Sequence, residues 1–214
     1  NSKLGDGDVD GYGLSAYATA DVYKNVSVFG LIGYSDQDFD LERTTQQGQV
    51  DASTDLSSFV LNAGARYLAY EKNELSVAPY LVLGYEQASA DSFNEEGAID
   101  ALRHDGYDAS RLTADLGVSG QWSTKIADRA FTVEAILGLR QVLADDQDDM
   151  TATLIANPAA SYSVSYADDD STLINVGLNL GYEVTKGGSV YAGYEGLLGG
   201  ESSNKFNLGY RHSF

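Results

Sequence analysis

The sequence predicts an all-β protein, an antiparallel transmembrane β-barrel of the outer-membrane type, and three observations support this. Apolar and polar residues alternate with period two along almost the whole chain, which is the pattern of strands with one apolar face. Glycine (23 residues) and tyrosine (15) are abundant, whereas proline occurs only at Pro79 and Pro158. No apolar run reaches the about 18 residues of a membrane helix, but a barrel strand crosses with about 9–11 tilted residues.

The composition excludes several classes of function. The 214 residues suffice for one large domain, so residues 1–214 are expected to form a single unit. The absence of cysteine removes disulfides, thiolate nucleophiles and cysteine-ligated metals. The formal net charge of -19 disfavours nucleic acid as a partner. We expect no cofactor.

The alternation defines about nine strands. In residues 171–184, for example, Ile174, Val176 and Leu178 share one face, whereas Asn175 and Gly177 share the other. A helix would scatter these apolar residues around its axis. The expected strands are residues 8–23, 26–40, 53–70, 75–91, 107–123, 129–145, 171–184, 188–199 and 203–214.

The connections between these strands alternate in length. We expect short turns at Lys24-Asn25, Glu71 to Glu74, Thr124 to Asp128 and Thr185 to Gly188, and long polar loops at 41–52, 92–106 and 146–170. The acidic clusters Asp145, Asp146, Asp148, Asp149 and Asp168 to Asp170 are expected in solvated loops. Outer-membrane barrels have short periplasmic turns and longer extracellular loops, so Phe214 is expected in the periplasm and Asn1 outside the cell.

An odd number of strands leaves the barrel open. Bacterial single-chain barrels have an even number of strands, and lipid does not tolerate open edges. We therefore expect N-terminal strands to be missing from this chain, or another protein to cover the edges. A soluble β-sandwich is the alternative, but its strands are shorter and would not place aromatic residues near strand ends opposite a face rich in glycine and charge.

The last strand carries the most specific pattern. Phe206, Leu208, Tyr210, His212 and Phe214 alternate with polar residues and Gly209. This resembles the C-terminal targeting signal that the barrel-assembly machinery reads, in which a glycine is followed by alternating hydrophobic residues and a final Phe. His212 departs from it, because a hydrophobic residue is usual there. An exposed apolar strand edge can recruit another sheet, which gives such a signal a physical basis.

The segment from Phe131 to Phe214 resembles the end of an autotransporter translocator domain. The resemblance runs through Thr132-Val133-Glu134, Ser161 to Val164, Gly177 to Tyr182, Tyr191 to Gly196 and Asn207 to Tyr210. It implies a twelve-stranded barrel in the bacterial outer membrane, with an N-terminal helix in its lumen, that exports a passenger domain to the cell surface. This chain would hold the last nine strands, and the helix, the passenger junction and three strands would precede Asn1.

Charged residues of the predicted strands fall on the face opposite the apolar one. Charges that face lipid cost about 2–4 kcal/mol at the midplane, so these side chains should line the lumen. They either hold the passenger linker or pair with one another in a structural network. The expected lining is Asp21, Arg66, Glu86, Arg111, Asp115, Glu134, Arg140, Glu183, Glu195 and Arg211.

The leading hypothesis is therefore a translocator barrel whose partners are outer-membrane lipid, the barrel-assembly machinery and its own passenger segment, without catalysis. A passenger-free porin-like or adhesin barrel is one alternative. Another is an outer-membrane hydrolase with a site on its loops, for which His104 beside Asp105 is the only loop histidine. The acidic loops do not match the spacing of an EF-hand calcium site.

Overall fold

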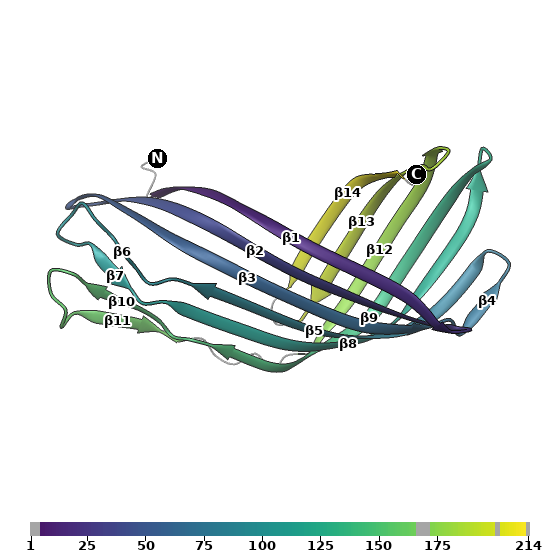
Figure 1. Ribbon diagram of the computed structural model, residues 1–214, viewed down its shortest axis with the longest axis horizontal. Coiled ribbons are helices and arrows are strands. Elements are labelled where there is room, and N and C mark those ends of the chain that lie inside the picture. The colour runs from purple at the N-terminus through teal and green to yellow at the C-terminus, as the bar shows by residue number, and fades with distance from the viewer. Residues whose placement is uncertain (1–4, 166–171, 200–201, 213–214) are drawn as a thin grey trace.

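The computed structural model describes residues 5–165, 172–199 and 202–212. One antiparallel sheet contains the nine predicted strands in chain order, each hydrogen-bonded to the next (Figure 1). They are β1 (Gly5–Tyr23), β2 (Val26–Thr45), β3 (Gly48–Tyr67), β5 (Leu75–Ala90), β8 (Tyr107–Ile126), β9 (Arg129–Gln147), β12 (Thr172–Thr185), β13 (Gly188–Leu198) and β14 (Ser203–His212).

Five further strands are short. The strand β4 (Tyr70–Lys72) pairs with β5 beside the turn that joins β3 to β5. A second sheet in the order β11-β10-β7-β6 contains β6 (Phe93–Asn94), β7 (Leu102–His104), β10 (Met150–Leu154) and β11 (Ser161–Val164). This second sheet, which we call the surface sheet, lies at the end of the molecule away from the short turns (Figure 1).

Tight turns connect the strands at one end, as the sequence predicts. Ala127 and Asp128 adopt φ values of 51° and 61° between β8 and β9, which is the conformation of a two-residue hairpin turn whose twist matches the strands. Lys24-Asn25 and Lys186-Gly187 form the turns of two other hairpins. The turn expected at Glu71 to Glu74 is shorter than predicted, because β4 extends to Lys72.

The opposite end differs from the expectation of long loops. Residues 41–52 are not a loop, because β2 and β3 continue in unbroken register until Thr45 faces Gly48. Strands of 20 residues are about 65 Å long, twice the about 30 Å of a hydrocarbon core, so these hairpins extend beyond the membrane. Apolar alternation could not reveal this part, since acids and other polar residues occupy both faces.

The other two predicted loops also contain regular structure. Residues 92–106 include β6 and β7, and residues 146–170 include β10 and β11. The acidic residues Asp145 and Asp146, expected in a loop, belong to β9. The strands of the surface sheet pair across up to about fifty residues of sequence, and each is too short for its own alternation to be recognised. Residues 168–170 lie outside the described part.

The main sheet is a single curled layer with open ends in the described part of the chain. Its order begins at β1 and ends at β14, and no ladder joins these two strands among the residues described. Large apolar residues on one face stay exposed, with Leu116 at 63%. A β-sandwich would bury this face under a second sheet. No helix among the described residues is long and apolar enough to cross a membrane.

Candidate functional site: the two faces of the barrel wall

The strand registers place the apolar side chains on one face of the main sheet. One cross-strand row consists of Leu81, Leu116, Leu139 and Ile174, which lie directly opposite one another on β5, β8, β9 and β12. All four are exposed. Monomeric soluble proteins rarely expose so large a contiguous apolar surface, and lipid covers it in a membrane protein. We call this side the outer face.

Aromatic residues mark the upper boundary of the apolar band on the outer face. The Tyr34 hydroxyl donates to Asp36 (3.0 Å), and the Tyr85 hydroxyl donates to Gln87 (3.2 Å). In both cases the acceptor is the next outer-face residue toward the surface sheet. Tyrosines at a membrane interface keep their rings in the apolar layer and direct their hydroxyls toward water. This row is therefore expected at the extracellular interface.

A second aromatic row lies toward the short turns. The Trp122 indole Nε1 donates to Glu74 (3.3 Å), and the Tyr210 hydroxyl lies 3.4 Å from His212 Nδ1. Leu112, which faces Tyr85 of the upper row, is ten residues before Trp122 on β8. Ten residues span about 33 Å along a strand and about 25 Å across a membrane when the strand is tilted, which matches the apolar band of such barrels.

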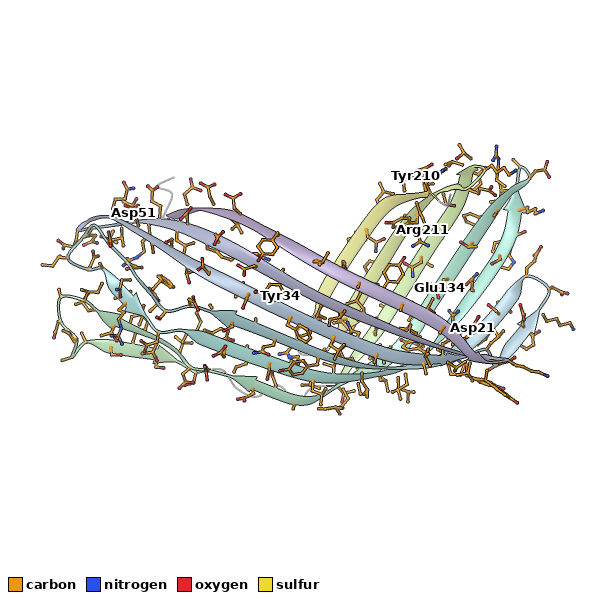
Figure 2. The ribbon with its side chains drawn as sticks, viewed as in Figure 1. Asp21, Tyr34, Asp51, Glu134, Tyr210 and Arg211 are labelled. Carbon is orange, nitrogen blue, oxygen red and sulfur yellow. The ribbon has the colours of Figure 1, made fainter. Side chains whose placement is uncertain are left out.

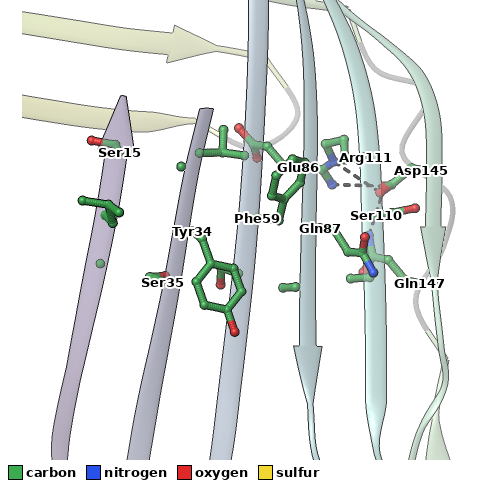
Figure 3. A pocket seen from close by; sticks show the side chains of 17 residues that line it. Ser15, Tyr34, Ser35, Phe59, Glu86, Gln87, Ser110, Arg111, Asp145 and Gln147 are labelled. Carbon is green, nitrogen blue, oxygen red and sulfur yellow. Dashed lines mark hydrogen bonds and ion pairs between the residues drawn. The ribbon is translucent and has the colours of Figure 1, made fainter. Parts of the chain in front are cut away.

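The polar face is the inner side of the curl. A hollow of about 570 Å³ is lined by residues from six neighbouring strands, β1, β2, β3, β5, β8 and β9 (Figure 3). Only a concave surface can bring residues from six strands around one hollow. Its polar lining includes Ser15, Ser35, Glu86, Arg111 and Asp145.

Arg111 and Asp145 form an ion pair in this hollow. Arg111 Nε and Nη2 donate to the two carboxylate oxygens at 3.2 and 3.0 Å (Figure 3), and the Asp145 side chain is only 3% exposed. Strict alternation would place Asp145 on the outer face. A register shift opposite Leu112 and Thr113 leaves Leu143 unpaired, and this β-bulge turns the following residues of β9 to the inner face.

A second ion pair lies lower on the inner face. Arg140 Nε donates to Asp115 Oδ1 at 2.8 Å, and the two residues face each other across β8 and β9. Tyr80 lies beside this pair above two glycines: its hydroxyl would be 2.5 Å from a Cβ added at Gly117 and 2.6 Å from one at Gly138. The buried hydroxyl has no hydrogen-bond partner among the described residues. Sequence analysis did not identify Tyr80, and only its place among the glycines could have suggested it.

The remaining predicted lining residues share the inner face by register. Glu134 accepts a hydrogen bond from Asn179 (3.3 Å), and Glu183 accepts one from the Ala130 amide (3.3 Å). Both line a hollow of about 600 Å³, whose opposite side carries Lys205 and Arg211. Arg66 faces Ser27 and Tyr80, and Glu195 faces Gly177 and Lys205. Asp21 accepts a hydrogen bond from Ser27, and the Arg211 guanidinium lies 5.9 Å from the Tyr191 ring centre. Figure 2 labels Asp21 and Arg211.

The residues of the expected assembly signal lie on the edge strand β14. Phe206, Leu208 and Tyr210 point to the outer face, and Leu208 is 84% exposed. On the inner face, the Tyr191 ring covers Gly209 so closely that a Cβ there would clash. His212 lies beside Tyr210 in the lower aromatic row. Phe214 lies outside the described residues.

His104, which was expected in a loop, is the last residue of β7 and contacts two other side chains. His104 stacks on Phe93 with ring centres 4.5 Å apart, and its Nε2 lies 3.4 Å from Glu95 Oε1. Within the described ranges, no group of three or more histidines and acids is placed to hold a metal ion.

Comparisons with known proteins agree with this geometry. The family model of the autotransporter β-domain matches residues 1–195. The chain belongs to this family. Its structure is also similar to the translocator domain of the autotransporter NalP from Neisseria meningitidis, with a TM-score of 0.73 and 16% identity over 99% of this chain and 68% of that one. A search of curated protein sequences found no match. The chain is thus an outer-membrane translocator barrel of the autotransporter type, located in the bacterial outer membrane.

Proposed function

We propose that this β-domain anchors and exports a passenger domain that precedes it in the same polypeptide. The observation that carries the proposal is the two-faced wall: an apolar outer face bounded by two aromatic rows, and an inner face with polar hollows. A polar inner surface lets a hydrated polypeptide segment pass through the apolar layer, where unsatisfied backbone groups would otherwise cost several kcal/mol.

The inner-face charges would contact the exported segment. Arg111 with Asp145 and Arg140 with Asp115 are paired within the wall, so their main role is to stabilise it. In the hollow of about 600 Å³, Glu134 and Glu183 on one side and Lys205 and Arg211 on the other have no ion pair within 4 Å in the described structure. These four groups are the ones that we expect a linker segment to contact.

We propose further strands between the open edges β1 and β14. Unpaired backbone groups are not tolerated in lipid, and the outer-face residues of both edge strands are apolar or aromatic within the membrane band, from Tyr12 to Val22 on β1 and from Phe206 to Tyr210 on β14. Additional strands of the same polypeptide would close the wall to an even number. During insertion, the free edge of β14, with Phe206, Leu208 and Tyr210 exposed, would pair with the barrel-assembly machinery.

Two alternatives depend on other observations. A porin-like barrel needs an open lumen and no passenger. A surface hydrolase needs a nucleophile beside its histidine, whereas the contacts given for His104 are with Glu95 and the Phe93 ring. We therefore propose that the barrel itself does not catalyse a reaction.

The experiment uses cells that produce the complete natural gene product. Protease added to intact cells should release a domain N-terminal to β1, whereas the β-domain stays in the membrane. Leu208→Asp should abolish both insertion and surface display, because it places a charge on the outer face of the edge strand. Asn207→Asp on the inner face is the matched control. A mature protein with only strands ahead of β1 would contradict export and favour the porin-like barrel.

A further inference from the structure

Glu95, between β6 and β7, is the centre of a buried polar cluster outside the membrane. Glu95 is only 8% exposed. Its carboxylate accepts hydrogen bonds from Arg43 Nε (2.9 Å), from Arg43 Nη2 and from the Leu102 amide (2.8 Å), and His104 Nε2 lies 3.4 Å away. Bidentate arginine–carboxylate pairs are the strongest side-chain hydrogen bonds, and a buried carboxylate requires such partners.

These partners come from different parts of the chain. Arg43 belongs to the long β2–β3 hairpin, whereas Leu102 and His104 belong to β7 of the surface sheet. Arg43 Nη2 also donates to the Asp100 carbonyl (3.1 Å), and the Thr45 hydroxyl donates to the Asp100 carboxylate (3.1 Å). One guanidinium therefore joins the barrel hairpin to the segment between β6 and β7.

Small apolar side chains are buried beside the cluster, where Val50 faces Arg43 and Ala152 faces His104. Val50 of β3 is 1% exposed, and Ala101 and Ala152 are also buried. The surface sheet is further connected to β3 by two backbone hydrogen bonds between Asp51 and Glu96, of 3.0 and 2.8 Å. Three alanine- and valine-sized side chains bury little area, so the polar cluster has to supply much of the attachment.

The register shows which face the cluster covers. β2 and β3 pair without a shift from Ser27 opposite Arg66 to Thr45 opposite Gly48. Arg43 is therefore on the same face as Ser27, which is the inner face. The antiparallel bridge between Asp51 and Glu96 sets the segment that holds Glu95 edge to edge with β3, as a continuation of the wall, and the Arg43 side chain reaches Glu95 from the inner face.

We infer that Glu95 is a positioning residue: its contacts with Arg43 and the Leu102 amide clasp the surface sheet to the β2–β3 extension, so that this sheet and the extension form one folded unit. The inference concerns the extracellular end and does not depend on export of a passenger. Without the clasp, the segments 93–104 and 150–164 become loose loops, whereas the membrane part of the wall stays folded. Arg103 and Asp105 form an exposed ion pair elsewhere on the same sheet and do not take part.

The clasp depends on pH through Glu95. Burial opposes its ionisation, but the hydrogen bonds from Arg43 and from the Leu102 amide outweigh burial and lower the pKa of Glu95. A carboxylate with a lowered pKa in the folded state adds stability above its unfolded pKa, and this stability is lost as the pH falls through the folded value. The other titratable groups near the clasp are Asp100, His104 and the Tyr162 phenol, which lies near Arg43.

The test is amide hydrogen exchange of the complete protein in detergent micelles. Glu95→Gln should accelerate exchange in 93–104 and 150–164 at neutral pH by at least about tenfold, because one partner of a buried pair loses its charge. Exchange in β5 and β8 should not change. Asp105→Asn, which removes the exposed pair of the same sheet, is the matched control and should leave both segments protected.

Two further variants distinguish positioning from general packing. Arg43→Lys keeps the positive charge but loses the two parallel hydrogen bonds of the guanidinium, so the exchange protection of 93–104 should lie between those of the unmodified protein and Glu95→Gln. In the unmodified protein, protection of 93–104 should fall on acidification, after correction for the intrinsic exchange rate, and Glu95→Gln should remove this transition. Full protection in Glu95→Gln, or an equal loss of protection in β5 and β8, would overturn the inference.

Discussion

Arg111 and Asp145 face each other across β8 and β9 only because Leu143 is left out of the ladder. Before the bulge, even-numbered residues of β9 such as Arg140 point inward; after it, odd-numbered residues such as Asp145 do. The bulge lies above the row of outer leucines, where β9 leaves the apolar band. Bulges near barrel rims redirect side chains in this way.

The first prediction concerns this ion pair. Asp145→Asn should lower the free energy of unfolding by about 1–3 kcal/mol, because the nearly buried carboxylate loses its charge while the guanidinium keeps its own. The measurement is the urea midpoint of the refolded protein in detergent. Asp146→Asn, at the exposed neighbouring position, should leave the midpoint unchanged. Equal midpoints for both variants would show that the pair adds no stability.

A second prediction follows from the bulge itself. Deletion of Leu143 should be tolerated, because Val142 already faces Thr113 and Ala144 already faces Leu112. Deletion of Leu137, in the regular part of the strand, should prevent folding, since a one-residue slip exchanges the two faces. Heat-modifiable migration on gels reports the folded barrel. The account of the bulge fails if the two deletions behave alike.

The third prediction concerns Tyr80. Gly117→Ala should destabilise the barrel by about 1–3 kcal/mol, because the new methyl would lie 2.5 Å from the Tyr80 hydroxyl and 2.6 Å from the Leu137 carbonyl. Gly120→Ala is the matched control, since nothing lies within 4 Å of its added Cβ. Tyr80→Phe removes a buried hydroxyl that has no hydrogen-bond partner in the described part of the chain, and should leave stability unchanged or raise it by up to about 1 kcal/mol. A large loss of stability in Tyr80→Phe would show that the Tyr80 hydroxyl does have a hydrogen-bond partner.

A fourth prediction concerns the row of like charges Asp10, Asp38 and Asp55, which lie directly opposite one another on the outer face above the upper aromatic row. The hydrogen bond to Asp38, followed by burial and by neighbouring carboxylates, raises the pKa of Asp55. A raised carboxyl pKa means that folding is favoured at low pH and that this advantage is lost as the pH rises through the folded pKa.

Asp38→Asn should therefore slow amide exchange in the β1–β3 extension at neutral pH, and the difference should shrink in high salt or acid. Hydrogen exchange at two salt concentrations measures this. If the slower exchange of Asp38→Asn persists unchanged at 1 M salt, where the screening length is about 3 Å, its cause is not electrostatic.

The sequence alone predicts the part of the fold in which apolar and polar residues alternate with period two. Each membrane-crossing strand has lipid on one side and a polar interior on the other, so its residues must alternate. The nine strands and the tight turns could be predicted from this alternation. That constraint ends at the aromatic rows. Beyond them, residues 41–52 form a hairpin and residues 92–106 pair with 150–164, and neither relationship leaves a periodic apolar signal.

The individual side-chain contacts of the wall were harder to predict from the sequence than its strands. The charges of the inner face follow from parity, so Asp115, Glu134 and Arg140 could be placed on one side. Asp145 could not, because a single unpaired residue reverses the parity. Glu95 lies outside any periodic segment, and its partner Arg43 is more than fifty residues away. Such contacts depend on tertiary pairing rather than on local sequence.

The central claim is that the row through Leu81, Leu116 and Leu139 faces lipid. The chain has no cysteine, so single spin labels can be attached at Leu116→Cys, Asn179→Cys and Asp38→Cys of the protein in lipid bilayers. The decisive measurement is the collision rate of each label with oxygen, which concentrates in lipid, and with a water-soluble nickel chelate. We expect the Leu116 label to meet oxygen and not the chelate, the Asp38 label to meet the chelate, and the Asn179 label to lack the lipid signature. A Leu116 label as accessible to the chelate as the Asp38 label would contradict the assignment of the two faces.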